Sequence, residues 1–163
     1  MSVTNKSTMH YQKLIDQYLA GPDTVANAVA GMSSGQLNAR PIAGKWSTRQ
    51  VVCHIADFEP IYADRMKRVI AESCPTFFGG NPDTFAAGLA YDHRPVETEL
   101  ELIAAVRRHM AAILRELKAS DFQRTGNHSE AGTLTLETLL HRIGEHIPHH
   151  VQFIAEKRKA LGL

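Results

Sequence analysis

The chain has 163 residues, of which 44% are hydrophobic and 21% charged, a composition typical of one folded domain and not of a disordered chain. Eighteen Lys and Arg residues against 17 Asp and Glu residues leave a net charge of +1, which argues against a nucleic-acid partner. A polar start and the lack of a long apolar run predict no export signal and no membrane partner, and the two cysteines favour a cytoplasmic protein. We therefore expect a single domain over residues 1–163.

Apolar residues recur at helical spacing over four long stretches, and no stretch alternates apolar and polar residues as a strand does. The sequence thus predicts an all-α fold. The first stretch runs over about residues 14–32 and contains Gly21 and Pro22, so we expect one kinked helix or two short helices there. A loop is expected over residues 31–44.

The second helix has the clearest start in the sequence. Ser47 is the expected N-cap, and Gln50 three residues later completes a capping box. Trp46 precedes the cap and is placed to pack on Val51 as a hydrophobic staple. The apolar stripe of this helix fades near Glu72.

The remaining elements follow a long connection. Residues 73–94 are rich in Gly, Pro, Asn and aromatic residues, which predicts a crossover with a turn of helix near residues 84–89. A third helix is expected over about residues 95–118, a polar turn over 120–132 and a fourth helix over about 134–160. The fold class is therefore a four-helix bundle with one long crossover connection.

Three of the nine histidines are placed to hold a metal ion. His146 and His150 are four residues apart, so on a helix they lie on one face about 6 Å apart along the axis. The apolar residues around them place both in the bundle interior, and His54 lies on the inward stripe of the second helix. Three neutral imidazoles leave a coordination position open, as in catalytic sites, and suit Zn²⁺ or neighbours such as Ni²⁺ and Fe²⁺.

Three residues beside His54 are further candidates. Asp57 is the candidate catalytic carboxylate: it either orients the His54 imidazole or lies at the pocket mouth, and the alternative is an ion pair. Cys53 is expected to be a small core residue and not a ligand. Glu59 is expected to be structural, paired with Arg65, Arg68 or Arg94.

Other features of the sequence bear on the same site. Ile147 and Pro148 follow His146, so the HExxH motif is absent and a zincin protease is excluded. Aromatic residues of the crossover are expected to cover the pocket opening; they are Phe77, Phe78, Phe85 and Tyr91. The remaining histidines near the cluster are expected at the surface or the pocket rim, without an assigned role; they are His128, His141 and His149.

Four segments carry a resemblance to a known family. They are Gly44–Ser47 (GKWS), His54–Glu59 (HIADFE), Gly132–Leu136 (GTLTL) and His146–Ile154 (HIPHHVQFI). Together they closely resemble the DinB-like (YfiT-related) superfamily, and the resemblance spans almost the whole chain. It implies a four-helix bundle with one divalent metal, most often Zn²⁺ or Ni²⁺, held by His54, His146 and His150. It also implies a homodimer, because many members form dimers.

The resemblance implies several activities. Relatives include S-transferases that use bacillithiol or mycothiol, a mycothiol-dependent isomerase, and proteins described only as metal-dependent hydrolases. The first hypothesis is that the metal activates a low-molecular-weight thiol, as cosubstrate, for attack on an electrophilic small-molecule substrate. The second is a hydrolase that uses metal-bound hydroxide, and the third is a non-catalytic, metal-stabilised dimeric bundle that binds a ligand.

Overall fold

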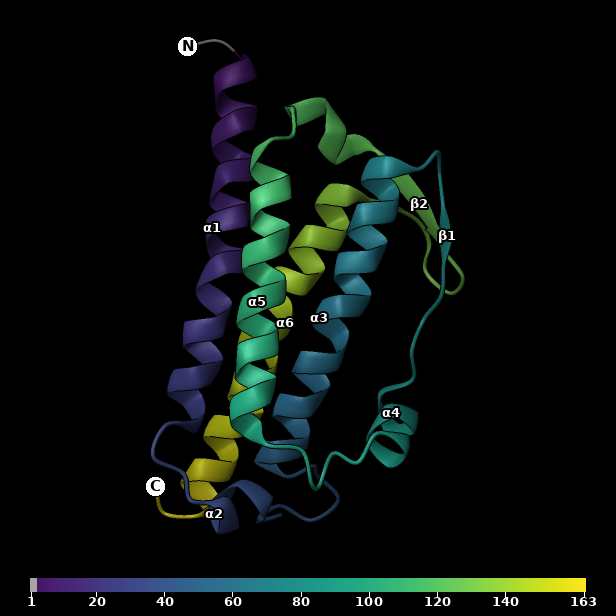
Figure 1. Cartoon of the computed structure of the whole chain (residues 1–163). Coiled ribbons are helices and arrows are strands. Elements are labelled where there is room, and N and C mark those ends of the chain that lie inside the picture. Colours follow the sequence, from purple (N-terminus) through teal and green to yellow (C-terminus); the bar gives the residue numbers. More distant parts are fainter. Residues whose placement is uncertain (1–2) are drawn as a thin grey trace.

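Four long helices pack side by side in the computed structural model, which describes residues 3–163 (Figure 1). They are α1 (Val3–Val29), α3 (Thr48–Ala71), α5 (Val96–Arg115) and α6 (Leu136–Ala160). α1 and α3 each pack against both α5 and α6. The predicted four-helix bundle is confirmed, and none of the described helices is long and apolar enough to span a membrane.

The long crossover connects two helices that run in the same direction. Figure 1 shows α3 and α5 both rising from the lower end of the bundle, so the chain returns along the bundle between them. This connection carries the strand β1 (Thr76–Phe77) and the helix α4 (Pro82–Gly88). α4 matches the helical turn expected near residues 84–89.

A small sheet at one end of the bundle was not predicted. Strand β2 (Thr125–His128) pairs in parallel with β1 and antiparallel with β3 (Gly132–Thr135), in the order β1-β2-β3. The expected polar turn over residues 120–132 is therefore wrong, and a 3-10 helix, η1 (Ala119–Gln123), precedes the sheet. These strands have two to four residues each, which is too short for an alternating pattern to stand out.

Capping residues determine where the helices α2 (Ser34–Asn38) and α3 begin. Ser47 accepts a hydrogen bond from the backbone N–H of Gln50, and the Gln50 side chain accepts from the Ser47 N–H, which confirms the predicted capping box. The expected loop over 31–44 is wrong in part, because a capping box at Ser33 starts the helix α2. Gly44 has a φ of +72°, so the turn before α3 uses a conformation that other residues rarely adopt.

α1 is one helix with Pro22 inside it, which agrees with one of the two expected alternatives and excludes a division into two short helices. Pro22 cannot donate a backbone hydrogen bond to the carbonyl of Tyr18. Arg107 Nη1 donates to that carbonyl instead, at 2.7 Å. The guanidinium fits because Gly21 has no side chain: a Cβ there would lie 2.0 Å from Arg107 Nη1.

The core consists of two apolar clusters with a charged layer between them. One cluster includes Ile15, Met66, Met110 and Leu139, and the other includes Val25, Ile55, Ile103 and Ile147. Tyr18, Glu59 and Arg107 lie between these positions along α1, α3 and α5, and all three side chains are fully buried. His54 and His146 directly precede Ile55 and Ile147 in the chain, so the metal-site candidates stand at the level of the second cluster.

Candidate metal centre

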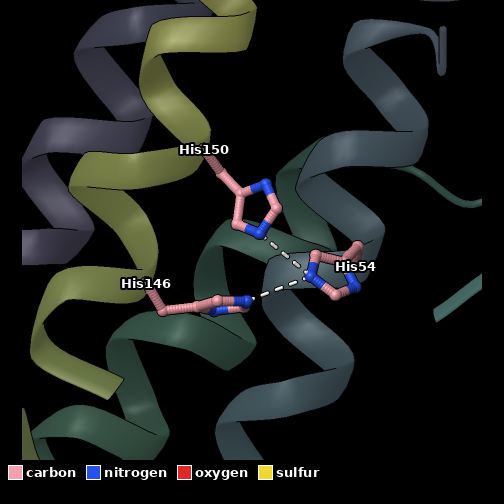
Figure 2. Close-up of side chains that lie close together, drawn as sticks. All are labelled: His54, His146 and His150. Atoms are coloured by element: carbon pink, nitrogen blue, oxygen red, sulfur yellow. Dashed lines mark hydrogen bonds between the residues drawn. The ribbon is translucent and has the colours of Figure 1, made fainter. Parts of the chain in front are cut away.

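Three imidazole rings from two helices converge in the bundle interior (Figure 2). His54 comes from α3, and His146 and His150 come from successive turns of α6. His54 Nε2 lies 3.0 Å from the Nε2 atoms of both other histidines. One nitrogen from each ring lies within 4.8 Å of the other two, a grouping that could hold one metal ion.

Aromatic packing fixes the His54 ring. The centroid of this ring lies 5.3 Å from that of the Trp46 ring and 4.7 Å from that of the Phe58 ring. Phe58 stands four residues later on α3. The capping box at Ser47 sets where α3 begins, so it also sets the turn of α3 that presents His54. The His54 side chain is only 4% exposed, while His146 and His150 are half-buried.

Burial keeps all three imidazoles neutral. Loss of hydration lowers the pKa of His54 from 6.5 to about 4, against the opposing charge of Asp57. Burial and the charges of the neighbouring histidines lower the pKa of His146 to about 2 and that of His150 to about 3. Neutral imidazole is the form that binds a metal.

The Nε2 geometry fits a divalent cation. Two imidazole nitrogens on a tetrahedral zinc ion stand about 3.3 Å apart, close to the 3.0 Å separations here. In the part of the chain that the structure describes, the buried Nδ1 atoms of His54 and His146 have no hydrogen-bond partner. In metal-binding imidazoles, the N–H of this second nitrogen commonly donates a hydrogen bond to a carboxylate or carbonyl oxygen. Packing against aromatic rings holds the imidazoles here instead.

Asp57 is engaged by an arginine. Arg94 Nη1 donates to Asp57 Oδ2 at 3.0 Å, and Arg94 Nη2 lies 2.8 Å from Oδ1. Arg94 also forms an ion pair with Glu99 on α5. Of the roles expected for Asp57, the observed contact is the ion pair, which ties α3 to the end of the crossover.

Glu59 has a different partner from those expected. Its carboxylate accepts hydrogen bonds from Arg107, with Nε at 2.8 Å, and from the hydroxyl of Tyr18. The expectation of Arg65, Arg68 or Arg94 is wrong, because each of these arginines has other partners. Arg65 donates to the carbonyl of Phe78, Arg68 pairs with Asp64 and Glu72, and Arg94 pairs with Asp57 and Glu99. Both side chains of the Glu59–Arg107 pair are fully buried.

Several other expectations can be compared with the structure. Cys53 is fully buried, and burial raises the pKa of its thiol to about 12, as befits a core residue and not a nucleophile. His141 and His149 are exposed as expected, whereas His128 is half-buried and its Nδ1 accepts from two backbone N–H groups.

The aromatic cluster of the crossover does not act as one cover. Phe77 and Tyr91 are buried, and Phe78 is 73% exposed. Phe85 of α4 approaches the site through Phe58, with the two ring centroids 5.7 Å apart, and Tyr91 approaches it through Trp46, with the centroids 6.3 Å apart. The expectation of a four-residue cover is wrong because Phe77 enters the core next to the small sheet.

The sequence reasoning missed two buried basic residues near the site. Arg107 crosses the bundle to Glu59, and Lys157 of α6 is 3% exposed beside His150. A signal for Lys157 was present: it stands seven residues after His150, which returns to nearly the same helix face.

A four-helix bundle with an interior group of three histidines defines a class of helical proteins that could bind a metal. Comparison with known proteins identifies the family. The family model of the DinB superfamily matches residues 17–154, so the chain belongs to the DinB superfamily.

Similar proteins have names that refer to metal-dependent hydrolysis. One from Oceanobacillus iheyensis, named as an inferred metal-dependent hydrolase, is 30% identical over 85% of this chain and 81% of its own length. Another so named, from Bacillus mycoides, is 26% identical over 92% and 88%. The solved structure of YfiT from Bacillus subtilis, described as an inferred metal-dependent hydrolase with an unusual four-helix-bundle topology, superposes with a TM-score of 0.87. It is 26% identical and covers 93% of this chain and 87% of its own.

Proposed function

We propose that the protein is a metal-dependent hydrolase in which His54, His146 and His150 hold one divalent cation, Zn²⁺ or Ni²⁺. The convergence of the three Nε2 atoms is the observation that carries this proposal. The names of the similar proteins support the reaction class. When bound, such a cation lowers the pKa of a water or thiol ligand and so supplies a nucleophile near neutral pH.

The chain's own residues hold and shield this site. The three imidazoles stay neutral at pH 7 because burial holds their pKa values well below 6.5. Trp46 and Phe58 keep the His54 ring in place and limit the access of water on that side. The buried ion pair of Glu59 and Arg107 lies one turn further along α3 and makes the bundle rigid beside the ligands.

A second candidate is transfer of a low-molecular-weight thiol to an electrophilic substrate. In the described part of the chain, the group that could hold a metal contains three histidines and no carboxylate, and Asp57 is engaged by Arg94. Amide hydrolysis needs a group that protonates the leaving amine, whereas a cation held by these histidines would lower the pKa of a bound thiol enough that no protein base would be needed. This observation favours thiol transfer over amide hydrolysis, and ester hydrolysis remains compatible with it.

The first experiment measures metal content by plasma mass spectrometry. Wild type is compared with a His54→Ala, His146→Ala, His150→Ala triple variant and with His141→Ala, which removes an exposed histidine of the same helix. We expect about one equivalent of metal per chain in wild type and in His141→Ala, and none in a triple variant that is folded by circular dichroism. Wild type that takes up no Zn²⁺ or Ni²⁺ contradicts both enzymatic candidates and leaves a ligand-binding bundle.

Turnover then separates the two reactions. We expect zinc-loaded wild type to hydrolyse 4-nitrophenyl acetate without thiol, at a rate above that of the triple variant, which corrects for surface histidines such as His149. Turnover of 1-chloro-2,4-dinitrobenzene only with added thiol, and no ester hydrolysis, favours the transferase. The homodimer and the cytoplasmic location stay predictions, and light scattering and cell fractionation test them.

A further inference from the structure

A cavity of about 200 Å³ opens beside His150, between the loop that precedes α3 and the last turns of α6. Trp46 and Phe153 give it apolar walls, and His150 lines it together with three charged residues. These are Lys45, Lys157 and Glu156. Small-molecule sites commonly combine apolar walls with a few placed polar groups.

Lys157 is the unusual member of this lining. Its side chain is charged yet only 3% exposed; its ammonium group donates a hydrogen bond to the carbonyl of Phe153 at 3.1 Å and lies 6.0 Å from the centre of the Phe153 ring. An ammonium group has three N–H donors, and a buried charge costs free energy unless an opposite charge or several acceptors compensate it. Burial lowers the pKa of Lys157, and nearby Lys45 adds to this effect while Glu156 opposes it.

The charges around the cavity favour an anion. Two residues with ammonium groups, Lys45 and Lys157, and one with a carboxylate, Glu156, line the cavity. Lys45 and Glu156 are exposed, so water screens both, whereas the charge of Lys157 is sheltered from water. A carboxylate that entered the cavity would offer Lys157 an opposite charge and a second acceptor beside the carbonyl of Phe153.

Helix geometry relates this lysine to the metal-site candidates. Seven residues bring Lys157 to within about 20° of the direction of His150 and about 10 Å further along α6. A molecule of moderate length can therefore reach from His150 to Lys157 along one face of the helix. Trp46 and Phe153 line the path between these ends.

We propose that this cavity binds a carboxylate group of the substrate through Lys157, with the apolar part of the substrate between Trp46 and Phe153. The substrates would then be esters, or thiol-reactive electrophiles, that carry a carboxylate several bonds away from the reacting carbon. This inference rests on the proposed function, because it places the reacting end of the substrate at His150.

Binding of two matched probes tests the proposal on zinc-loaded protein. The probes are 4-phenylbutyrate and its uncharged amide, 4-phenylbutyramide, and the readout is fluorescence of Trp46, the single tryptophan of the chain. We expect the carboxylate to bind wild type at least tenfold more tightly than the amide. Equal binding of the two probes to wild type overturns the proposal without need of any variant.

Variants identify the group that recognises the carboxylate. Lys157→Met keeps an unbranched apolar side chain and should bring the two affinities within about twofold of each other. Lys159→Met, which removes an exposed lysine of the same turn, should keep the tenfold preference. A full preference in folded Lys157→Met means that the carboxylate binds the metal or another cation, and this result also overturns the proposal.

The same experiment separates this proposal from the proposed function. Probe binding does not require turnover, so a carboxylate preference without hydrolysis or thiol transfer supports the cavity and contradicts the enzymatic function. Turnover of esters with equal binding of both probes supports the enzymatic function and overturns the carboxylate site.

Discussion

Arg107 supplies the hydrogen bond that Pro22 removes from α1. The proline leaves the carbonyl of Tyr18 without its helical donor, and Arg107 Nη1 reaches that oxygen from α5 at 2.7 Å. The same guanidinium donates to the carbonyl of Ile143 on α6 and to Glu59 on α3. One side chain therefore links all four helices of the bundle.

Removing either partner of the Glu59–Arg107 pair should strongly destabilise the protein. We expect Glu59→Leu and Arg107→Met each to lower the free energy of unfolding by about 3–5 kcal/mol, because each leaves a buried charge uncompensated. The double variant should lose at least about 2 kcal/mol less than the sum, since neither charge remains. Urea denaturation gives the free energy of unfolding of wild type, the two single variants and the double variant. Additive losses would show that the two charges do not depend on each other.

Two helical glycines should respond in opposite ways to alanine. Gly21→Ala places a Cβ against Arg107, whose nitrogens are fixed by several acceptors, so we expect a loss of about 2 kcal/mol or more. Gly144→Ala on α6 meets nothing within 4 Å and should gain up to about 1 kcal/mol from helix propensity. Thermal unfolding followed by circular dichroism compares the pair, and a stabilised Gly21→Ala would contradict the close approach of Arg107.

The stability of metal-free protein should fall as the pH drops below about 6.5. The pKa values of His54, His146 and His150 lie at about 4, 2 and 3 in the folded state, below the ordinary value of 6.5. The unfolded chain therefore binds more protons in this range, and stability that is present above pH 6.5 is lost toward pH 4. Each such histidine contributes a slope of about 1.4 kcal/mol per pH unit.

Variants isolate this effect from general acid destabilisation. Urea denaturation at pH 7, 6 and 5 should give a shallower decline for His146→Ala than for wild type. His141→Ala, which removes an exposed histidine, should decline as wild type does. Parallel declines for all three proteins would mean that the buried imidazoles do not control the pH dependence.

Substitutions at Asp57 and Arg94 should separate a structural role from a chemical one. If the ion pair is the role of Asp57, Asp57→Asn costs about 1–2 kcal/mol, and Arg94→Met costs more because it also leaves buried Glu99 without its partner. The double variant should cost little more than Arg94→Met, and all three variants should keep one metal per chain. Any loss of turnover should then be similar in Asp57→Asn and Arg94→Met. Loss of turnover in Asp57→Asn alone, with metal content intact, would assign Asp57 to the reaction.

Local signals predicted the parts of the fold that depend on neighbouring residues. The capping box of Ser47 and Gln50 located the start of α3, and the helical spacing of His146 and His150 placed both on one face. The inward stripe of α3 brought in His54 as the third member of the group. The candidate site followed from helix periodicity because all three residues lie on long helices.

The features that were missed depend on contacts between distant segments. The pairing of β1 with β2 joins Phe77 to His128, and neither strand is long enough to show a pattern by itself. The partner of Glu59 is 48 residues away on α5, and the donor to the carbonyl of Tyr18, which Pro22 cannot serve, is the same arginine. The surroundings of Lys157 likewise combine distant segments, because the loop at Gly44 and the last turns of α6 line one cavity.

Because α6 is the last long helix of the chain, the three histidines come together late during synthesis. His54 is translated well before α6, and a nascent chain that has emerged only through α5 carries one of the three imidazoles. A single imidazole binds zinc or nickel weakly, so firm capture of the proposed metal would wait until α6 has emerged and docked on α3. Acquisition of the metal would thus report that the last long helix has reached its place.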